Sequence, residues 1–114
     1  MSGAQNRRRY PRYDARRLPG VLDGFRTLEA LKLSLGGALI RMPFELTLEQ
    51  PVQIALELGG ETFRTPAVVV FVGPDLAEKE RGAYRIGLAF TDMRPADRAL
   101  LERFIDASLG SPEP

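Results

Sequence analysis

The chain has 114 residues, and its 16 Lys and Arg against 15 Asp and Glu leave a formal net charge of +1. It contains no His, Cys or Trp, which excludes the usual zinc sites, Ser–His–Asp or Cys–His catalysis and disulfide frameworks. We expect one globular domain in the cytoplasm, because the sequence has neither a secretory signal nor an apolar run near the roughly 20 residues that span a membrane.

The charge is unevenly distributed along the chain. Residues 1–20 carry six arginines and one acid, whereas the remainder carries ten basic and fourteen acidic side chains. We expect residues 1–17 to form a flexible, arginine-rich arm, because so polar a stretch cannot bury enough apolar surface to order itself. A solvated charge run is one interpretation of this arm. The other is a segment that orders over an anionic ligand, since clustered guanidinium groups suit phosphates and guanine edges.

The middle of the chain has the pattern of short strands joined by tight turns. Asp23-Gly24 predicts a hairpin turn, and residues 52–58 alternate apolar with polar or small side chains, as in a half-buried strand. Residues 67–72 are continuously apolar, and Gly36-Gly37 predicts a turn in which the glycines supply positive φ. Asp75 is expected to be solvated in a charged loop over residues 73–82. The predicted strands cover residues 18–22, 25–33, 38–42, 52–58, 61–72 and 84–90.

The periodicity changes after the last predicted strand. Pro95 suits the first turn of a helix, and Leu101, Phe104 and Ile105 recur at helical spacing up to Gly110, which can end it. Six strands followed by one amphipathic helix predict a mainly β fold, a six-stranded antiparallel barrel with a C-terminal α-helix. This domain is expected over residues 18–110, with residues 111–114 as a tail.

Three motifs in this order resemble those of the PilZ domain family. Residues 7–12, Arg-Arg-Arg-Tyr-Pro-Arg, are similar to its RxxxR arm, and residues 32–38, Lys-Leu-Ser-Leu-Gly-Gly-Ala, are similar to its (D/N)xSxxG motif. Residues 85–90 resemble the strand before the family's C-terminal helix. The resemblance implies a β-barrel that binds cyclic di-GMP in bacterial signalling, with no enzymatic activity and no metal or other cofactor. Carried over by position, the ligand-binding residues are Arg7, Arg8, Arg12, Lys32, Ser34 and Gly37.

Lys32 departs from the family pattern, which has Asp or Asn at this position. A carboxylate could accept from the N1–H and N2 amino donors of guanine, whereas an ammonium has donors only. Two functions therefore stay open: a cyclic di-GMP receptor that changes a surface for a protein partner, and a degenerate PilZ adaptor that binds protein without the nucleotide. A nonspecific nucleic-acid binder would fit the positive charge of the arm but not the net negative charge of residues 21–114. We expect no specific DNA or RNA partner and no membrane insertion.

Overall fold

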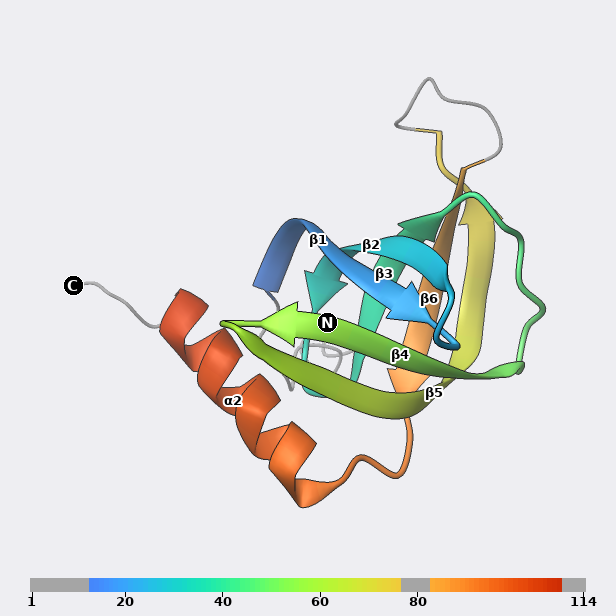
Figure 1. The fold of residues 1–114 in the computed structure, drawn as a ribbon. Coiled ribbons are helices and arrows are strands. Elements are labelled where there is room, and N and C mark those ends of the chain that lie inside the picture. The colour runs from blue at the N-terminus through green and yellow to red at the C-terminus, as the bar shows by residue number, and fades with distance from the viewer. Residues whose placement is uncertain (1–12, 77–82, 110–114) are drawn as a thin grey trace, which may run out of the picture.

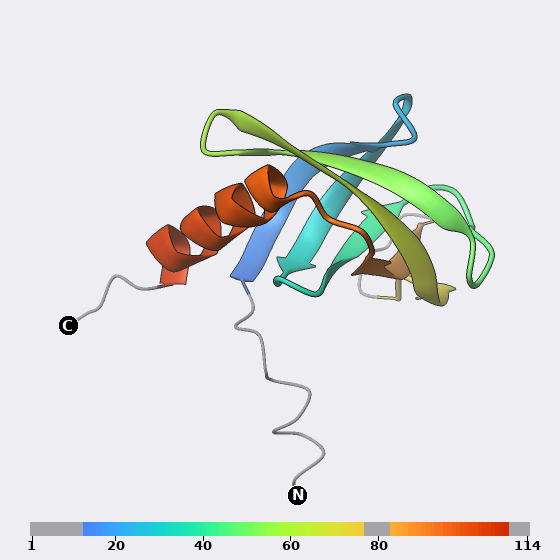
Figure 2. The same ribbon diagram turned by 90° about the horizontal axis from the view of Figure 1, so that it is seen from below.

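The computed structural model describes residues 13–76 and 83–109. Its elements are β1 (Tyr13–Leu22), β2 (Arg26–Leu33), β3 (Gly37–Met42), β4 (Pro51–Leu58), β5 (Glu61–Pro74), β6 (Tyr84–Phe90) and α2 (Pro95–Leu109). The strands form a closed antiparallel barrel in the order β1-β2-β3-β6-β5-β4 (Figure 1). The helix α2 lies beside the β4–β5 hairpin and also contacts β1 (Figure 2). The predicted six-stranded barrel with a C-terminal helix is therefore confirmed.

β1 is longer than the sequence indicated. It begins at Tyr13 rather than Leu18, so residues 13–17, which were assigned to the arm, belong to the barrel. The pairing of β1 with β2 shifts in register between Asp14 and Leu18. Such an irregularity breaks the period-2 pattern by which a strand is recognised. Arg7, Arg8 and Arg12 lie outside the described residues, as do residues 77–82 and 110–114.

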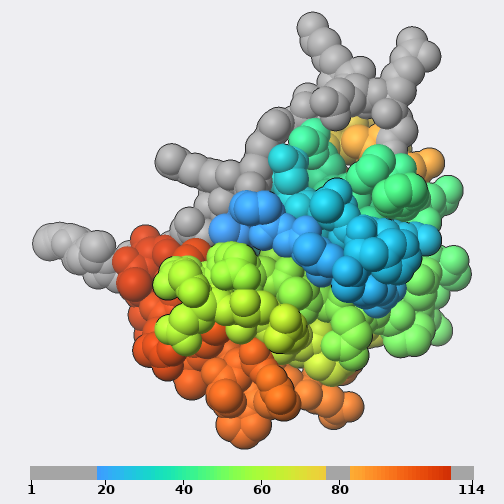
Figure 3. Space-filling model, in the orientation of Figure 1, coloured from blue at the N-terminus to red at the C-terminus, as the bar shows by residue number. Residues whose placement is uncertain are grey.

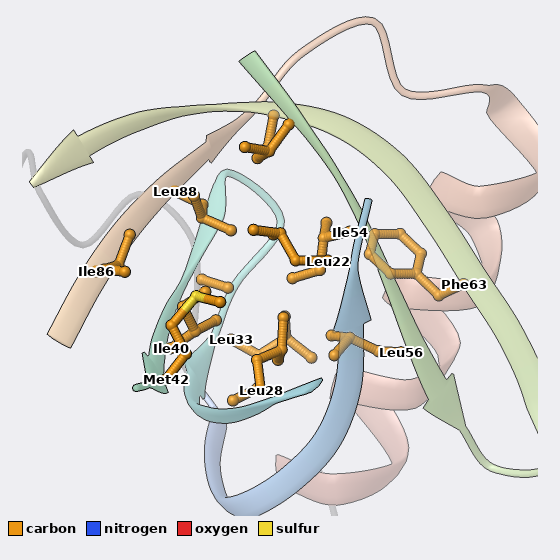
Figure 4. Packing of buried hydrophobic residues seen from close by; sticks show 14 of the residues in the cluster. Leu22, Leu28, Leu33, Ile40, Met42, Ile54, Leu56, Phe63, Ile86 and Leu88 are labelled. Atoms are coloured by element: carbon orange, nitrogen blue, oxygen red, sulfur yellow. The ribbon is translucent and has the colours of Figure 1, made fainter. Parts of the chain in front are cut away.

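Inward-facing apolar side chains fill the barrel. In β4 they are the residues that the alternation of apolar with polar or small side chains predicted. Val52, Ile54, Leu56 and Leu58 are all buried, and they meet apolar side chains from the other strands (Figure 4). The helix contributes Leu101 and Ile105, which are also buried. Full burial of one such side chain stabilises the fold by about 1.5–3 kcal/mol. The packed core therefore holds the strands in place, and with them the side chains on the outer surface of the barrel.

Asp97 attaches α2 to the barrel. Its carboxylate accepts a hydrogen bond from the backbone N–H of Arg64 in β5 (3.0 Å) and another from Nε of Arg94 (3.1 Å). β5 pairs with β6 only from Ala67 onward, so Asp97 supplies a partner to an amide on the free edge of β5. In the space-filling view α2 packs directly against the β4–β5 hairpin (Figure 3). No helix within residues 13–76 and 83–109 is long and apolar enough to cross a membrane.

Asp75 is buried, and the expectation that it is solvated was wrong. Its side chain is 1% exposed, and its carboxylate lies 3.3 Å from Nε of Arg85 and 3.7 Å from Nε of Arg41. Arg41 also pairs with Glu29 on β2. The backbone N–H of Asp75 donates to the carbonyl of Ala83 (3.0 Å), which brings together the two ends of the connection between β5 and β6. Two arginines from neighbouring strands thus compensate the buried carboxylate.

Candidate functional site

The turn between β2 and β3 is held by its own hydrogen bonds. The Ser34 N–H donates to the carbonyl of Gly37 (2.9 Å), and the Ser34 hydroxyl accepts from the N–H of Gly36 (3.2 Å). The same hydroxyl donates to the Gly37 carbonyl at a longer distance (3.4 Å). The Gly36 carbonyl accepts from the N–H of Phe90 (2.9 Å), which fixes the turn to the end of β6. Ser34 therefore shapes this turn.

Gly37 is required by a close approach of two strands. The described glycines with positive φ are Gly24, Gly59 and Gly60, so Gly37 does not serve the turn in the way the sequence suggested. A Cβ atom on Gly37 would overlap the carbonyl oxygen of Leu88 in β6 and lie 3.2 Å from its carbonyl carbon. Gly37 thus permits β3 to pair closely with β6.

One row of register partners crosses the outside of the barrel beside this turn. Lys32 on β2 pairs with Leu39 on β3, and Leu39 pairs with Gly87 on β6. Gly87 in turn pairs with Phe71 on β5. Because Gly87 has no side chain, the row has a gap between Leu39 and Phe71. A surface hollow of about 310 Å³ lies here, and we call it the Gly87 hollow.

The predicted site residues that the structure describes all line this hollow. Lys32, Ser34 and Gly37 contribute to its wall, and Lys32 is exposed. Tyr13, at the start of β1, is the register partner of Leu33. Arg12 immediately precedes Tyr13. Residues 7–12, which we call the arginine-rich segment, are therefore connected to the barrel at a point beside the Ser34 turn. The contacts of Arg7, Arg8 and Arg12 lie outside what the structure describes.

Phe71 and Gly87 are two of the lining residues that sequence reasoning missed. The strand predicted at 61–72 ends in a continuously apolar run, yet Val70 and Phe71 in this run are 57% and 52% exposed. The pairing of β5 with β6 shifts in register between Val69 and Phe71, which places both residues on the outside. Glycine within a strand often marks a bulge or a close approach. Gly87, in the middle of β6, was therefore the feature of the sequence that could have pointed to this hollow.

A larger hollow lies elsewhere on the barrel. It measures about 860 Å³ and covers the seam where β1 pairs with β4, around Gly20, Val21 and Ala55. None of the predicted site residues within the described part of the chain lines it. The Gly87 hollow, although smaller, is the one that the motif residues surround.

Similar proteins carry the same fold. The chain resembles the Bacillus subtilis inhibitor of motility MotI/DgrA, with a TM-score of 0.74 and 20% identity over 93% of this chain and 53% of that one. It also resembles the PilZ domain of Escherichia coli YcgR, solved with c-di-GMP, with a TM-score of 0.71 and 21% identity over 90% and 91% of the two chains. For the PilZ domain of CeSA from a cellulose-synthesizing bacterium the TM-score is 0.62, with 24% identity over 84% and 95%.

The chain spans about half the length of MotI/DgrA and less than half of the longer YcgR chain solved with c-di-GMP. No curated protein sequence matches it significantly. The model of the PilZ domain family matches residues 6–107, which includes the arginine-rich segment, the Ser34 turn and most of α2. By this match over nearly its whole length, the chain belongs to the PilZ domain family.

Proposed function

We propose that this chain is a cyclic di-GMP receptor and adaptor, without enzymatic activity, in which nucleotide binding changes a surface for a protein partner. The observation that carries the proposal is the register of β1. Tyr13 pairs with Leu33, so the arginine-rich segment is attached beside Ser34 and the Gly87 hollow. Membership of the PilZ family and the similarity to YcgR, whose structure was solved with c-di-GMP, support the proposal.

The residues around the hollow suit an anionic dinucleotide. By the family motif, Arg8 and Arg12 would each offer a planar fork to a phosphate or to O6 and N7 of guanine, and Arg7 would add a further cation. Lys32 is exposed at the same hollow and adds a cation there, but it offers no acceptor to the donors on the guanine edge. The arm at residues 1–12 would order on binding and thereby alter the surface that a cytoplasmic protein partner meets.

One observation favours a second candidate, a PilZ adaptor that has lost the nucleotide. Lys32 replaces the acidic or amide side chain of the motif, and the Ser34 hydroxyl already has two partners within its own turn. In this case the barrel would act through protein contacts alone. Neither candidate involves specific DNA or RNA binding or insertion into a membrane.

Calorimetric titration of the full chain with cyclic di-GMP, and with cyclic di-AMP for comparison, distinguishes the two candidates. The receptor predicts saturable binding of cyclic di-GMP, weaker binding of cyclic di-AMP, and loss of binding in Arg12→Ala. Arg98→Ala is the matched control, because Arg98 is an exposed arginine on α2 in an ion pair with Glu102. Absence of heat with the wild-type chain would refute the receptor and leave the adaptor.

A further inference from the structure

One end of the barrel presents a group of large apolar side chains to solvent. Phe25, in the turn between β1 and β2, is 71% exposed, and Phe44 and Leu48, in the connection between β3 and β4, are 46% and 57% exposed. Both segments lie at the same end of the barrel in two perpendicular views (Figures 1 and 2). Single exposed apolar residues are common on protein surfaces, whereas a group of them marks a contact site. We call Phe25, Arg26, Phe44, Glu45 and Leu48 the Phe25 face.

Arg26 links the two aromatic side chains of this face. Its Cζ lies 5.3 Å from the centre of the Phe25 ring and 5.0 Å from the centre of the Phe44 ring. At such distances a cation is attracted to the face of the ring, so the guanidinium and the rings hold one another in place. Within residues 13–76 and 83–109 no carboxylate forms an ion pair with Arg26. Its N–H donors are therefore available to a carboxylate from another molecule.

The turn that carries Phe25 is fixed to the barrel. Asp23 and Gly24 both have positive φ (52° and 81°), as in the type I′ hairpin turn that Asp-Gly favours. The N–H of Asp23 donates to the carbonyl of Gln53 in β4 (2.7 Å), and the N–H of Gln53 donates to the carboxylate of Asp23 (2.9 Å). A segment that is already held in place loses less conformational freedom when a partner binds it.

The charges around this face favour one kind of partner. Within residues 23–27 and 43–50, Arg26 is the single basic residue, whereas Asp23, Glu45 and Glu49 are exposed acids. The acids disfavour an anionic membrane or a nucleic acid. Among the described residues Glu45, like Arg26, has no ion-pair partner. A complementary surface offers a carboxylate to Arg26 and a cation to Glu45, and the same face of a second copy offers both.

The shape of this end is also self-complementary. A hollow of about 540 Å³ lies beside Phe44, and its lining residues are Glu45, Leu46, Thr47, Leu48 and Val72. We call it the Glu45 hollow. Each copy thus carries an exposed ring, Phe25, and a partly apolar recess. In a two-fold dimer the same patch of both copies is in contact, so the ring of each copy meets the recess of the other.

We infer that the Phe25 face binds a second copy of this chain about a two-fold axis. Arg26 of each copy pairs with Glu45 of the other, and Phe25 of each copy lies against the Glu45 hollow of the other. Arg26 begins β2 and Leu33 ends it, so roughly 23 Å of strand separates this face from the Ser34 turn. The dimer therefore leaves the Gly87 hollow open, and the inference does not depend on nucleotide binding.

Sedimentation equilibrium of the full chain without ligand tests the inference. The wild type should show a monomer–dimer equilibrium with a Kd of about 1–100 µM, because the face is small. Phe25→Ala should weaken the association about 30-fold, the loss typical of a central aromatic contact. Arg98→Glu is the matched control for a change of charge, because Arg98 is exposed on α2, outside the Phe25 face. It should leave the Kd unchanged.

Charge reversal tests the pairing itself. Arg26→Glu and Glu45→Arg should each be monomeric, because each places like charges opposite one another in the dimer. An equimolar mixture of the two variants should form a heterodimer, since the carboxylates of the first then face the arginines of the second. Thermal unfolding checks that each variant folds, and the mixture shows that both retain a competent face.

Three results would overturn the inference. A wild-type chain that stays monomeric at all concentrations excludes a second copy as the partner. A dimer that persists in both Phe25→Ala and Arg26→Glu forms through another surface, and a mixture without heterodimer excludes the pairing of Arg26 with Glu45. Co-sedimentation with phosphatidylglycerol vesicles provides a further check, because binding by the wild type that is lost in Phe25→Ala would assign the face to a membrane instead.

Discussion

Replacing Gly37 by alanine tests whether this motif glycine is needed by the barrel itself. The added methyl group would overlap the carbonyl oxygen of Leu88 in β6. β6 is paired with β3 on one side and β5 on the other, so its backbone cannot move away without breaking strand hydrogen bonds. Overpacking of this kind costs about 1–3 kcal/mol, or more where the neighbour cannot move. The lower entropy of an unfolded chain with alanine offsets about 0.4–1 kcal/mol of this cost.

Because the neighbour is backbone that cannot move, the upper end of this range applies, and after the offset we expect Gly37→Ala to lose about 2 kcal/mol of unfolding free energy. This lowers the melting temperature by roughly 8–16 °C for a domain of this size. Thermal unfolding followed by far-UV circular dichroism measures this change without any ligand. Gly87→Ala is the control, because its Cβ would lie 3.1 Å from Cβ of Phe71, a tight contact that a shift of a few tenths of an ångström relieves, whereas a Cβ on Gly37 would overlap a backbone oxygen. A Gly37→Ala chain that melts at or above the wild-type temperature would refute the reasoning, as would greater destabilisation by Gly87→Ala.

Three further substitutions test the site and its scaffold. Lys32→Asp should tighten cyclic di-GMP binding by a few-fold to about a hundredfold, or roughly 1–3 kcal/mol, because it restores an acceptor for guanine. Titration at two salt concentrations measures this, and weaker binding with a shallower salt dependence would instead identify Lys32 as a phosphate ligand. Asp97→Ala should lower the unfolding free energy in urea by about 1–3 kcal/mol, since the Arg64 N–H loses its acceptor, and Asp97→Asn should lose less. Asp75→Ala should cost a similar amount, about 1–3 kcal/mol, because Arg85 loses a hydrogen-bond acceptor and Arg41 a nearby carboxylate; unchanged urea unfolding would contradict that role.

The sequence by itself determined the number of strands, the position of most of them and the helix. These are local properties of the sequence. The alternation from Val52 to Leu58 already indicates which side chains face inward, and the spacing of Leu101 and Ile105 indicates which face of α2 is apolar. The motif resemblance also located Lys32 and Ser34, which the fold brings to one hollow. Residues 13–17 escaped detection because an irregular pairing carries no period-2 pattern.

Only the tertiary structure decided which strands pair and which side chains break the local pattern. β3 pairs with β6 and β1 with β4, although neither pair is adjacent in sequence. The outward position of Phe71 depends on the register between β5 and β6, and the burial of Asp75 depends on arginines from two other strands. The need for glycine at Gly37 arises from the backbone of β6. Register is set between segments far apart along the chain, so no local pattern contains it, and register decides the face on which each side chain lies.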